Sequence, residues 1–230
     1  MRQWVDVAAD LVIGAHCPGC ARPGLGICPR CASAVRPKPR TVEIAGVDLP
    51  IVAAGSYRGV GERVVRRWKG VGHRESARWA AYAVASCVLQ FALDAPVLVP
   101  VPATRRSRRR RGAWLVGDLA RDAATLLRRH GDMDVSVAPV VRLRRQTADQ
   151  RGLGLVERAR NTRGAFSARP PNGAGPVVIV DDVVTTGATM QAVAAALTAA
   201  GWNVCGGVAA LATPPPGDHR AAVVIGAGAG

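Results

Sequence analysis

Aromatic residues are scarce in this chain. Phe, Trp and Tyr make up 4% of its 230 residues, whereas 49% of the residues are hydrophobic. Ala, Val and Gly therefore fill most of the apolar positions. Small aliphatic side chains suit packed helices on parallel strands better than a β-sandwich, so the composition favours an α/β protein with one full domain and a small appendage.

Long apolar runs are also missing. No stretch reaches the roughly 20 uncharged apolar residues that a membrane helix needs, which argues against a membrane protein. The segment Met1–His16 contains Asp6 and Asp10, unlike a secretory signal. We therefore expect a cytoplasmic protein with no membrane partner. In that compartment paired cysteines indicate a metal site rather than disulfides.

Lysine is nearly absent, since Lys38 and Lys69 are the only two, yet the formal net charge is +15 and the pI is about 11.2. The positive charge is therefore carried by arginine, which pairs with phosphate in a planar, two-pronged geometry. A GC-rich genome explains much of the choice of Arg over Lys, but it does not explain the excess of positive over negative charge. That excess predicts a phosphate-rich partner: a nucleotide, a pyrophosphate or a nucleic acid.

Short apolar runs alternate with helical periodicity along most of the chain. This alternation predicts a doubly wound, mostly parallel α/β sheet. We place the N-terminal segment at residues 1–50 and the α/β domain at 51–230. The expected strands are 95–102, 135–141, 177–180, 204–211 and 221–225; a hairpin is expected at 42–57, and helices at 1–16, 57–69, 75–92, 114–130 and 189–200.

Two cysteine pairs, Cys17-x-x-Cys20 and Cys28-x-x-Cys31, stand near the N-terminus. Their spacing is typical of two zinc knuckles that together form a closed structural Zn²⁺ site with four thiolate ligands. The seven-residue gap between the pairs is shorter than in common two-knuckle spacings. A redox pair or unliganded thiols are the alternatives, and His16 is a further possible ligand.

Two acids and a turn of small residues follow the strand expected at 177–180. Asp181 and Asp182 lie at its carboxyl end, where open α/β sheets bind ligands. The turn then opens a helix, so its backbone N–H groups can bind a phosphate. The acids are suited to the vicinal hydroxyls of a ribose, directly or through Mg²⁺. The candidate phosphate-binding residues are Thr185, Thr186, Gly187, Ala188 and Thr189.

An ordinary capped helix after a strand explains any one of these residues, but it explains all of them together poorly. Two arginine-bearing loops add to the pattern. In the loop Thr104–Gly112, Arg109 and Arg111 are candidates for neutralising a pyrophosphate, although most of its arginines also fit a solvated or nucleic-acid-binding loop. Residues 142–164 are expected to form a mobile loop that closes over the site, or a plain surface loop. Its candidate residues are Thr147, Gln150, Arg158 and Asn161.

In this order the motifs resemble the ComF family of competence-associated phosphoribosyltransferase-like proteins. The resemblance spans nearly the whole chain and is carried by Tyr57–Lys69, Val99-Pro100-Val101-Pro102, Arg111–Gly112, the series from Thr147 to Phe166, and Asp181–Thr189; family members also tend to begin with a four-Cys, zinc-finger-like segment. One departure is the run Ala113-Trp114-Leu115, where the family usually has a Phe-Asn-Gln-like run. Any ligand contact made by that amide pair is absent here.

The resemblance implies a type I phosphoribosyltransferase fold that binds phosphoribosyl pyrophosphate with Mg²⁺. It assigns Asp181 and Asp182 as the catalytic, ribose-binding acids of an enzyme that transfers or cleaves the phosphoribosyl group, with an open acceptor and a role related to DNA uptake. The alternative is a non-catalytic module that keeps this fold and binds single-stranded DNA. The high positive charge favours the second reading, and the intact phosphate loop favours the first.

Overall fold

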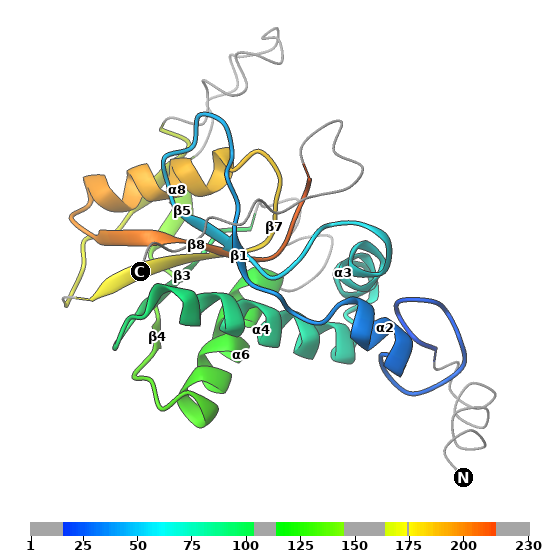
Figure 1. Cartoon of the computed structure of the whole chain (residues 1–230). Helices are drawn as coiled ribbons and strands as arrows, with labels where there is room; N and C mark the ends of the chain where they lie inside the picture. Colours follow the sequence, from blue (N-terminus) through cyan, green and yellow to red (C-terminus); the bar gives the residue numbers. More distant parts are fainter. Residues whose placement is uncertain (1–15, 104–113, 145–163, 174, 215–230) are drawn as a thin grey trace, which may run out of the picture.

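The computed structural model of the chain describes residues 16–103, 114–144, 164–173 and 175–214 (Figure 1). Its centre is a six-stranded sheet in the order β1-β2-β8-β7-β3-β4. The strands are β1 (Arg40–Thr41), β2 (Ile51–Ala53), β3 (Val97–Pro100), β4 (Ser136–Val137), β7 (Pro176–Val184) and β8 (Asn203–Ala212). Only β1 runs antiparallel to its neighbour, so the predicted mostly parallel α/β sheet is confirmed.

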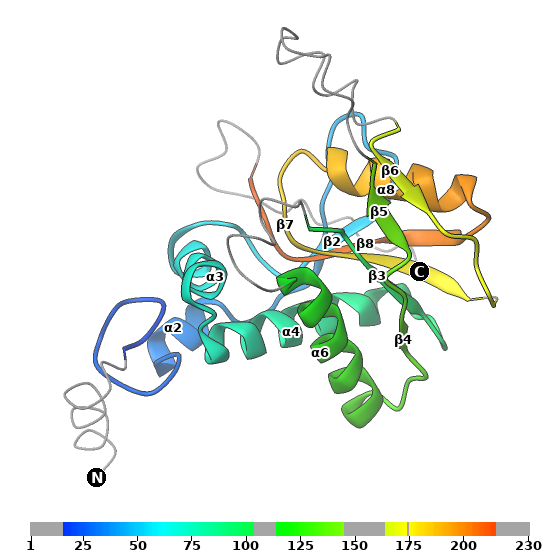
Figure 2. The same cartoon turned by 180° about the vertical axis from the view of Figure 1, so that it is seen from behind.

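Helices cover both faces of this sheet (Figures 1 and 2). The helices α4 (Arg74–Val88) and α6 (Leu115–His130) lie on one face, and α8 (Ala188–Ala199) lies on the other. A separate two-stranded antiparallel sheet, β5 (Val141–Leu143) and β6 (Phe166–Ala168), packs beside α8. Two further helices, α2 (Pro29–Ala34) and η1 (Leu89–Phe91), are short. The helix α3 (Gly59–Val71) packs against α2 and α4. Among the described residues, none of the helices combines the length and apolar character needed to cross a membrane.

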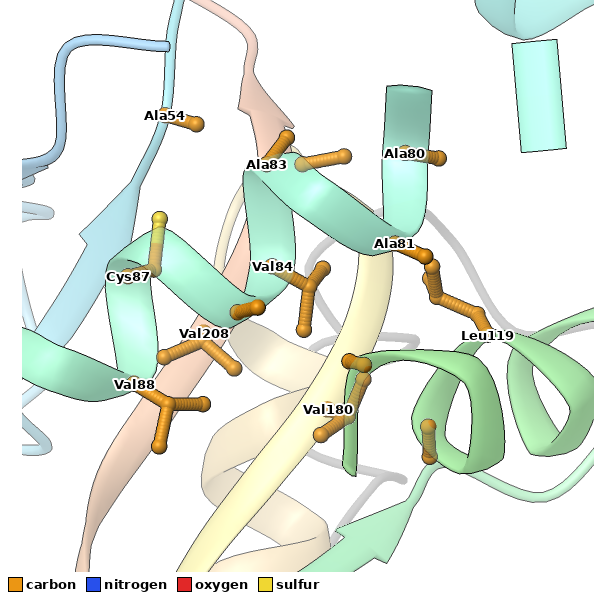
Figure 3. Packing of buried hydrophobic residues seen from close by; sticks show 14 of the residues in the cluster. Ala54, Ala80, Ala81, Ala83, Val84, Cys87, Val88, Leu119, Val180 and Val208 are labelled. Atoms are coloured by element: carbon orange, nitrogen blue, oxygen red, sulfur yellow. The ribbon is translucent and has the colours of Figure 1, made fainter. Parts of the chain in front are cut away.

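Small side chains build the main core, as the scarcity of aromatics predicts. On α4, Ala80, Ala83 and Val84 are fully buried, and Val84 points toward Val180 and Val208 of the sheet (Figure 3). An alanine leaves little between a helix and the strand beneath it, so α4 packs closely on β7 and β8.

Two strand predictions were wrong in extent. The single strand expected at 135–141 is divided between β4 and β5, which belong to different sheets. Pro139 lies between them, and proline has no N–H with which to continue a ladder. In contrast, β7 does not end at Val180 but continues through both acids to Val184, because β8 offers it backbone partners as far as Ala212.

The remaining predicted elements fall in two groups. The helices expected at 57–69, 75–92, 114–130 and 189–200 are confirmed as α3, α4 with η1, α6 and α8. A hairpin is present, with β1 paired antiparallel to β2, but its strands span 40–53 rather than the predicted 42–57. Because β1 lies within residues 1–50 and joins the main sheet, that segment contributes to the α/β core; the domain boundary at residue 50 stays a prediction. The helix over 1–15 and the strand over 221–225 lie outside the described residues.

Candidate functional site

The four cysteines of the two predicted knuckles converge in space. The Sγ atoms of Cys17, Cys20, Cys28 and Cys31 all lie within 4.8 Å of one another, and those of Cys20 and Cys28 are 3.7 Å apart. A tetrahedral zinc ion with Zn–S bonds of about 2.3 Å holds its sulfurs about 3.8 Å apart. The cluster therefore could hold a structural metal such as zinc, and His16 is not part of it.

The charges of these thiols also fit a cation. Burial alone would raise the pKa of Cys17, but the backbone N–H groups of Cys28, Gly19 and Cys20 outweigh it and lower that pKa from 9.0 to about 7. Burial, together with the neighbouring thiols, raises the pKa of Cys31 to about 12. Four thiolates in so small a volume repel one another, and a divalent cation removes that repulsion.

The cysteine cluster is attached to the α/β unit by specific contacts. Arg63 of α3 donates from Nε to the carbonyl oxygen of Gly19. A Cβ on Gly19 would come within 2.8 Å of both Cys31 Sγ and Val60 Cγ1, so only glycine lets the first knuckle approach α3 this closely. With four sulfur ligands and no open position, the site is structural in kind rather than catalytic.

The two acids lie at the carboxyl end of the central strand β7. Asp182 is buried and faces α3, where Lys69 Nζ lies 2.6 Å from its Oδ1. The two partners are 113 residues apart in sequence. Lys69 was not among the predicted site residues. The signals that pointed to it were its place at the end of the Tyr57–Lys69 motif and its status as one of only two lysines.

Asp181 has a different environment from its neighbour. Its Oδ1 accepts a hydrogen bond of 2.8 Å from the backbone N–H of Asp182. Burial, followed by the charge of Asp182, raises the pKa of Asp181 from 3.8 to about 7, against the opposing effects of that N–H and of Lys69. Each of the two carboxyl groups thus accepts a hydrogen bond at one oxygen, from Lys69 or from a backbone N–H. Within the described part of the chain, the second oxygen of each has no protein partner.

The turn after β7 has the predicted geometry. Gly187 begins α8 with φ 66°, in the left-handed region that favours glycine, and no side chain caps the first turn. Its N–H groups therefore keep the orientation and partial charge that bind anions. Thr185, Thr186 and Thr189 are exposed, and Ala188 is half-buried. The connection between β1 and β2 packs over this turn, since a Cβ on Gly187 would lie 3.0 Å from Val47 and 3.1 Å from Ile44.

Trp114 contacts the neighbouring strand end. Trp114 precedes α6, and its indole N–H donates to the carbonyl oxygen of Val101 at 3.1 Å, just after β3. β3 pairs directly with β7, so this position lies beside the acid pair. The structure thus brings together the acids, the turn and the end of β3. The other predicted site residues lie outside the described residues: Arg109, Arg111, Thr147, Gln150, Arg158 and Asn161.

A basic cleft of about 790 Å³ lies elsewhere, between the first knuckle and α3. Arg63, Arg66 and Arg67 of α3 line it together with Glu62 and the segment from His16 to Ala21. Arg66 pairs with Glu62 at 3.3 Å on the exposed surface, and such a pair contributes little to stability. The cleft therefore carries net positive charge before any charge of a bound metal is counted.

A scan against protein-family models finds no match for this chain, and a search of curated proteins finds none either.

Proposed function

We propose that the chain binds phosphoribosyl pyrophosphate with Mg²⁺ at the carboxyl end of β7 and transfers or cleaves its phosphoribosyl group. The observation that carries the proposal is the pair Asp181 and Asp182 near the carboxyl end of β7, with two residues between Asp182 and the turn that opens α8. Two carboxyl oxygens without described protein partners suit a vicinal diol, and a helix N-terminus beside them suits a phosphate. On this proposal the fold is that of a type I phosphoribosyltransferase, in line with the ComF resemblance and its link to DNA uptake.

Each part of the site has a distinct role in this chemistry. The acid pair orients the ribose through its hydroxyls, and the N–H groups from Thr185 to Thr189 hold the 5′-phosphate. Arginines would neutralise the pyrophosphate leaving group, and Mg²⁺ bound with the ligand would supply further positive charge there. The C1′ carbon then carries oxocarbenium character, and positioning with leaving-group stabilisation supplies most of the rate. The proposal does not specify the acceptor of the phosphoribosyl group.

Calorimetry with phosphoribosyl pyrophosphate and Mg²⁺ tests this function. We expect binding to wild type and a loss of at least about a hundredfold in affinity in the double variant Asp181→Asn/Asp182→Asn, because each of the two lost charge-assisted contacts costs about 1.5–3 kcal/mol. The matched control is Asp132→Asn/Asp134→Asn, which neutralises two exposed acids between α6 and β4. Unchanged affinity in the site variant would refute the assignment.

The basic cleft supports a second candidate function, binding of single-stranded DNA. Three arginines on one helix face form a surface suited to a phosphate backbone. Binding of this kind weakens with salt, with a log–log slope of about −0.7 per phosphate neutralised. A fluorescence titration with a labelled oligonucleotide at several salt concentrations measures that slope.

Two further comparisons show where on the protein the DNA binds. Arg66→Gln/Arg67→Gln should reduce the slope, whereas Arg121→Gln/Arg129→Gln on α6 removes the same charge elsewhere and should not. DNA in the cleft should leave phosphoribosyl pyrophosphate binding unaffected, whereas DNA across the acid pair should compete with it. No binding at low salt would remove this candidate and leave the first.

A further inference from the structure

Lys69 has no role in the function proposed above, yet it makes the closest charged contact to the acid pair. Its Nζ lies 2.6 Å from Asp182 Oδ1, with side chains that are 25% and 12% exposed. Solvent screens such a pair less than it screens an exposed surface pair. Lys69 therefore contributes its positive charge to the acid pair.

The core of α3 holds Lys69 in this position. Val64 and Val65 are fully buried, Trp68 is 4% exposed, and Lys69 follows directly in the last turn of the helix. α3 ends at Gly72, whose φ of 67° closes that turn. α3 packs against α2 and α4, and moving it would expose these three side chains, so the ammonium group stays beside Asp182.

A fixed ammonium changes what the acid pair can bind. Divalent cations such as Mg²⁺ bind carboxylates whose negative charge is uncompensated. Here Lys69 occupies one Asp182 oxygen and repels a second cation at short range. The charges of the two neighbours act on Asp181 in opposite directions, because Asp182 raises its pKa and Lys69 lowers it.

We propose that Lys69 is a positioning residue that prevents the Asp181–Asp182 pair from binding a free divalent cation, so that the cation enters only as a complex with a phosphate-bearing ligand. A pyrophosphate group supplies its own anionic oxygens to the metal, and these outweigh the repulsion from one ammonium. The statement about the ligand rests on the proposed function. The statement about the free cation rests on the ion pair alone.

Titration with Mn²⁺, followed by electron paramagnetic resonance on the zinc-loaded full chain at about pH 8, tests the inference. Wild type should bind no Mn²⁺ tighter than millimolar. Lys69→Met should gain a site with at least about tenfold higher affinity, because removing the ammonium leaves both carboxylates uncompensated. Lys38→Met removes the only other lysine, an exposed one, and should behave as wild type.

Two more variants distinguish the effect of the Lys69 charge from a loss of folded structure. Lys69→Arg keeps the cation and should not gain the site. Lys69→Met/Asp182→Asn should lose the site that Lys69→Met gained, which a merely disordered helix would not predict. If Lys69→Met does not fold, Lys69→Gln gives the same comparison in a polar side chain, with circular dichroism as the check on the fold.

Mn²⁺ binding by the wild-type protein alone also tests the inference. Mn²⁺ should be retained in the presence of inorganic pyrophosphate and not in its absence. Tight Mn²⁺ binding by wild type alone, or no gain in a folded Lys69→Met, would overturn the inference even if the ligand binds. A failure of wild type to bind phosphoribosyl pyrophosphate with Mg²⁺ would instead refute the proposed function and leave the Mn²⁺ comparison standing.

Discussion

The cysteine cluster and the acid pair depend on sequence in different ways. All four thiols lie between Cys17 and Cys31, so two tight turns bring them together. The charge of the acid pair depends on Lys69, which is 113 residues away from Asp182 and reaches it only once α3 has packed on the sheet. The cysteine motif therefore brings its own ligands together. For the acid pair, the sequence motif identifies the two carboxyl groups, but their charge depends on a lysine that tertiary packing places beside them.

The largest expected effect breaks the local site. Elemental analysis of the purified protein should find about one zinc per chain, and Cys17→Ser should abolish it, because three ligands hold a structural zinc poorly. Cys205→Ser is the matched control, since Cys205 lies in β8 outside the cluster. Limited proteolysis should then cleave the Cys17→Ser variant near residues 16–35 and spare the sheet. Full zinc retention in Cys17→Ser would contradict the assignment.

The next effect separates the two neighbouring acids, because the same substitution should change stability in opposite directions. The raised pKa of Asp181 means that the folded state holds this proton more tightly than the unfolded chain. Its contribution to stability is present below pH 3.8 and is lost as the pH rises through about 7. Asp181→Asn avoids this loss, so it should be neutral near pH 4 and stabilising by about 1–3 kcal/mol near pH 8.

Asp182→Asn should instead destabilise the fold by about 1–3 kcal/mol, because Lys69 keeps its charge and loses its partner. Chemical denaturation of both variants at the two pH values provides the measurement. Destabilisation by Asp181→Asn at high pH would show that its carboxylate is well stabilised in the fold and that the contrast between the acids is false.

A smaller effect is expected at the turn. Gly187→Ala places a Cβ in the left-handed region and within 3.0 Å of Val47. The conformational strain should cost about 1–2 kcal/mol and should also weaken phosphate binding. Gly70→Ala is the control, because a Cβ there meets nothing within 4 Å inside α3 and should stabilise by about 0.5–1 kcal/mol. Equal melting shifts for the two variants would mean that the turn is not constrained.

The smallest expected effect concerns the attachment of the N-terminal segment. Trp79 of α4 donates its indole N–H to the carbonyl oxygen of Val35 at 2.9 Å. Trp79→Phe keeps an apolar ring and removes the donor, which should cost about 0.5–1.5 kcal/mol. Hydrogen exchange should show the loss around residues 31–40, with the zinc content unchanged. A loss of zinc in this variant would mean that the cluster is less independent than its local sequence indicates.

The sequence predicted what short patterns encode. The alternation of apolar runs and helices yields the α/β sheet, and Cys-x-x-Cys spacing yields the cluster. The strand expected at 135–141 failed for a local reason, the proline at position 139, whereas the other errors came from partners distant in the chain. β7 continues through Asp181 and Asp182 because β8 pairs with it that far, although two acids in a row argue against a strand. Lys69 was missed as a site residue because its place at the end of a motif does not reveal a partner 113 residues away.

The placement of β2 inside the sheet has a consequence for how the protein is made. β2 pairs in parallel with β8, near the far end of the described chain. At about 5–20 residues per second, a ribosome completes β8 roughly 10–30 seconds after it has synthesised β2. During that interval α3 and α4 have no complete sheet to cover, and their apolar faces are open to chaperones or to other nascent chains. Truncation before Asn203 would make this interval permanent, removing the partner of both β2 and β7 and leaving the acids of β7 without the strand that holds them in line.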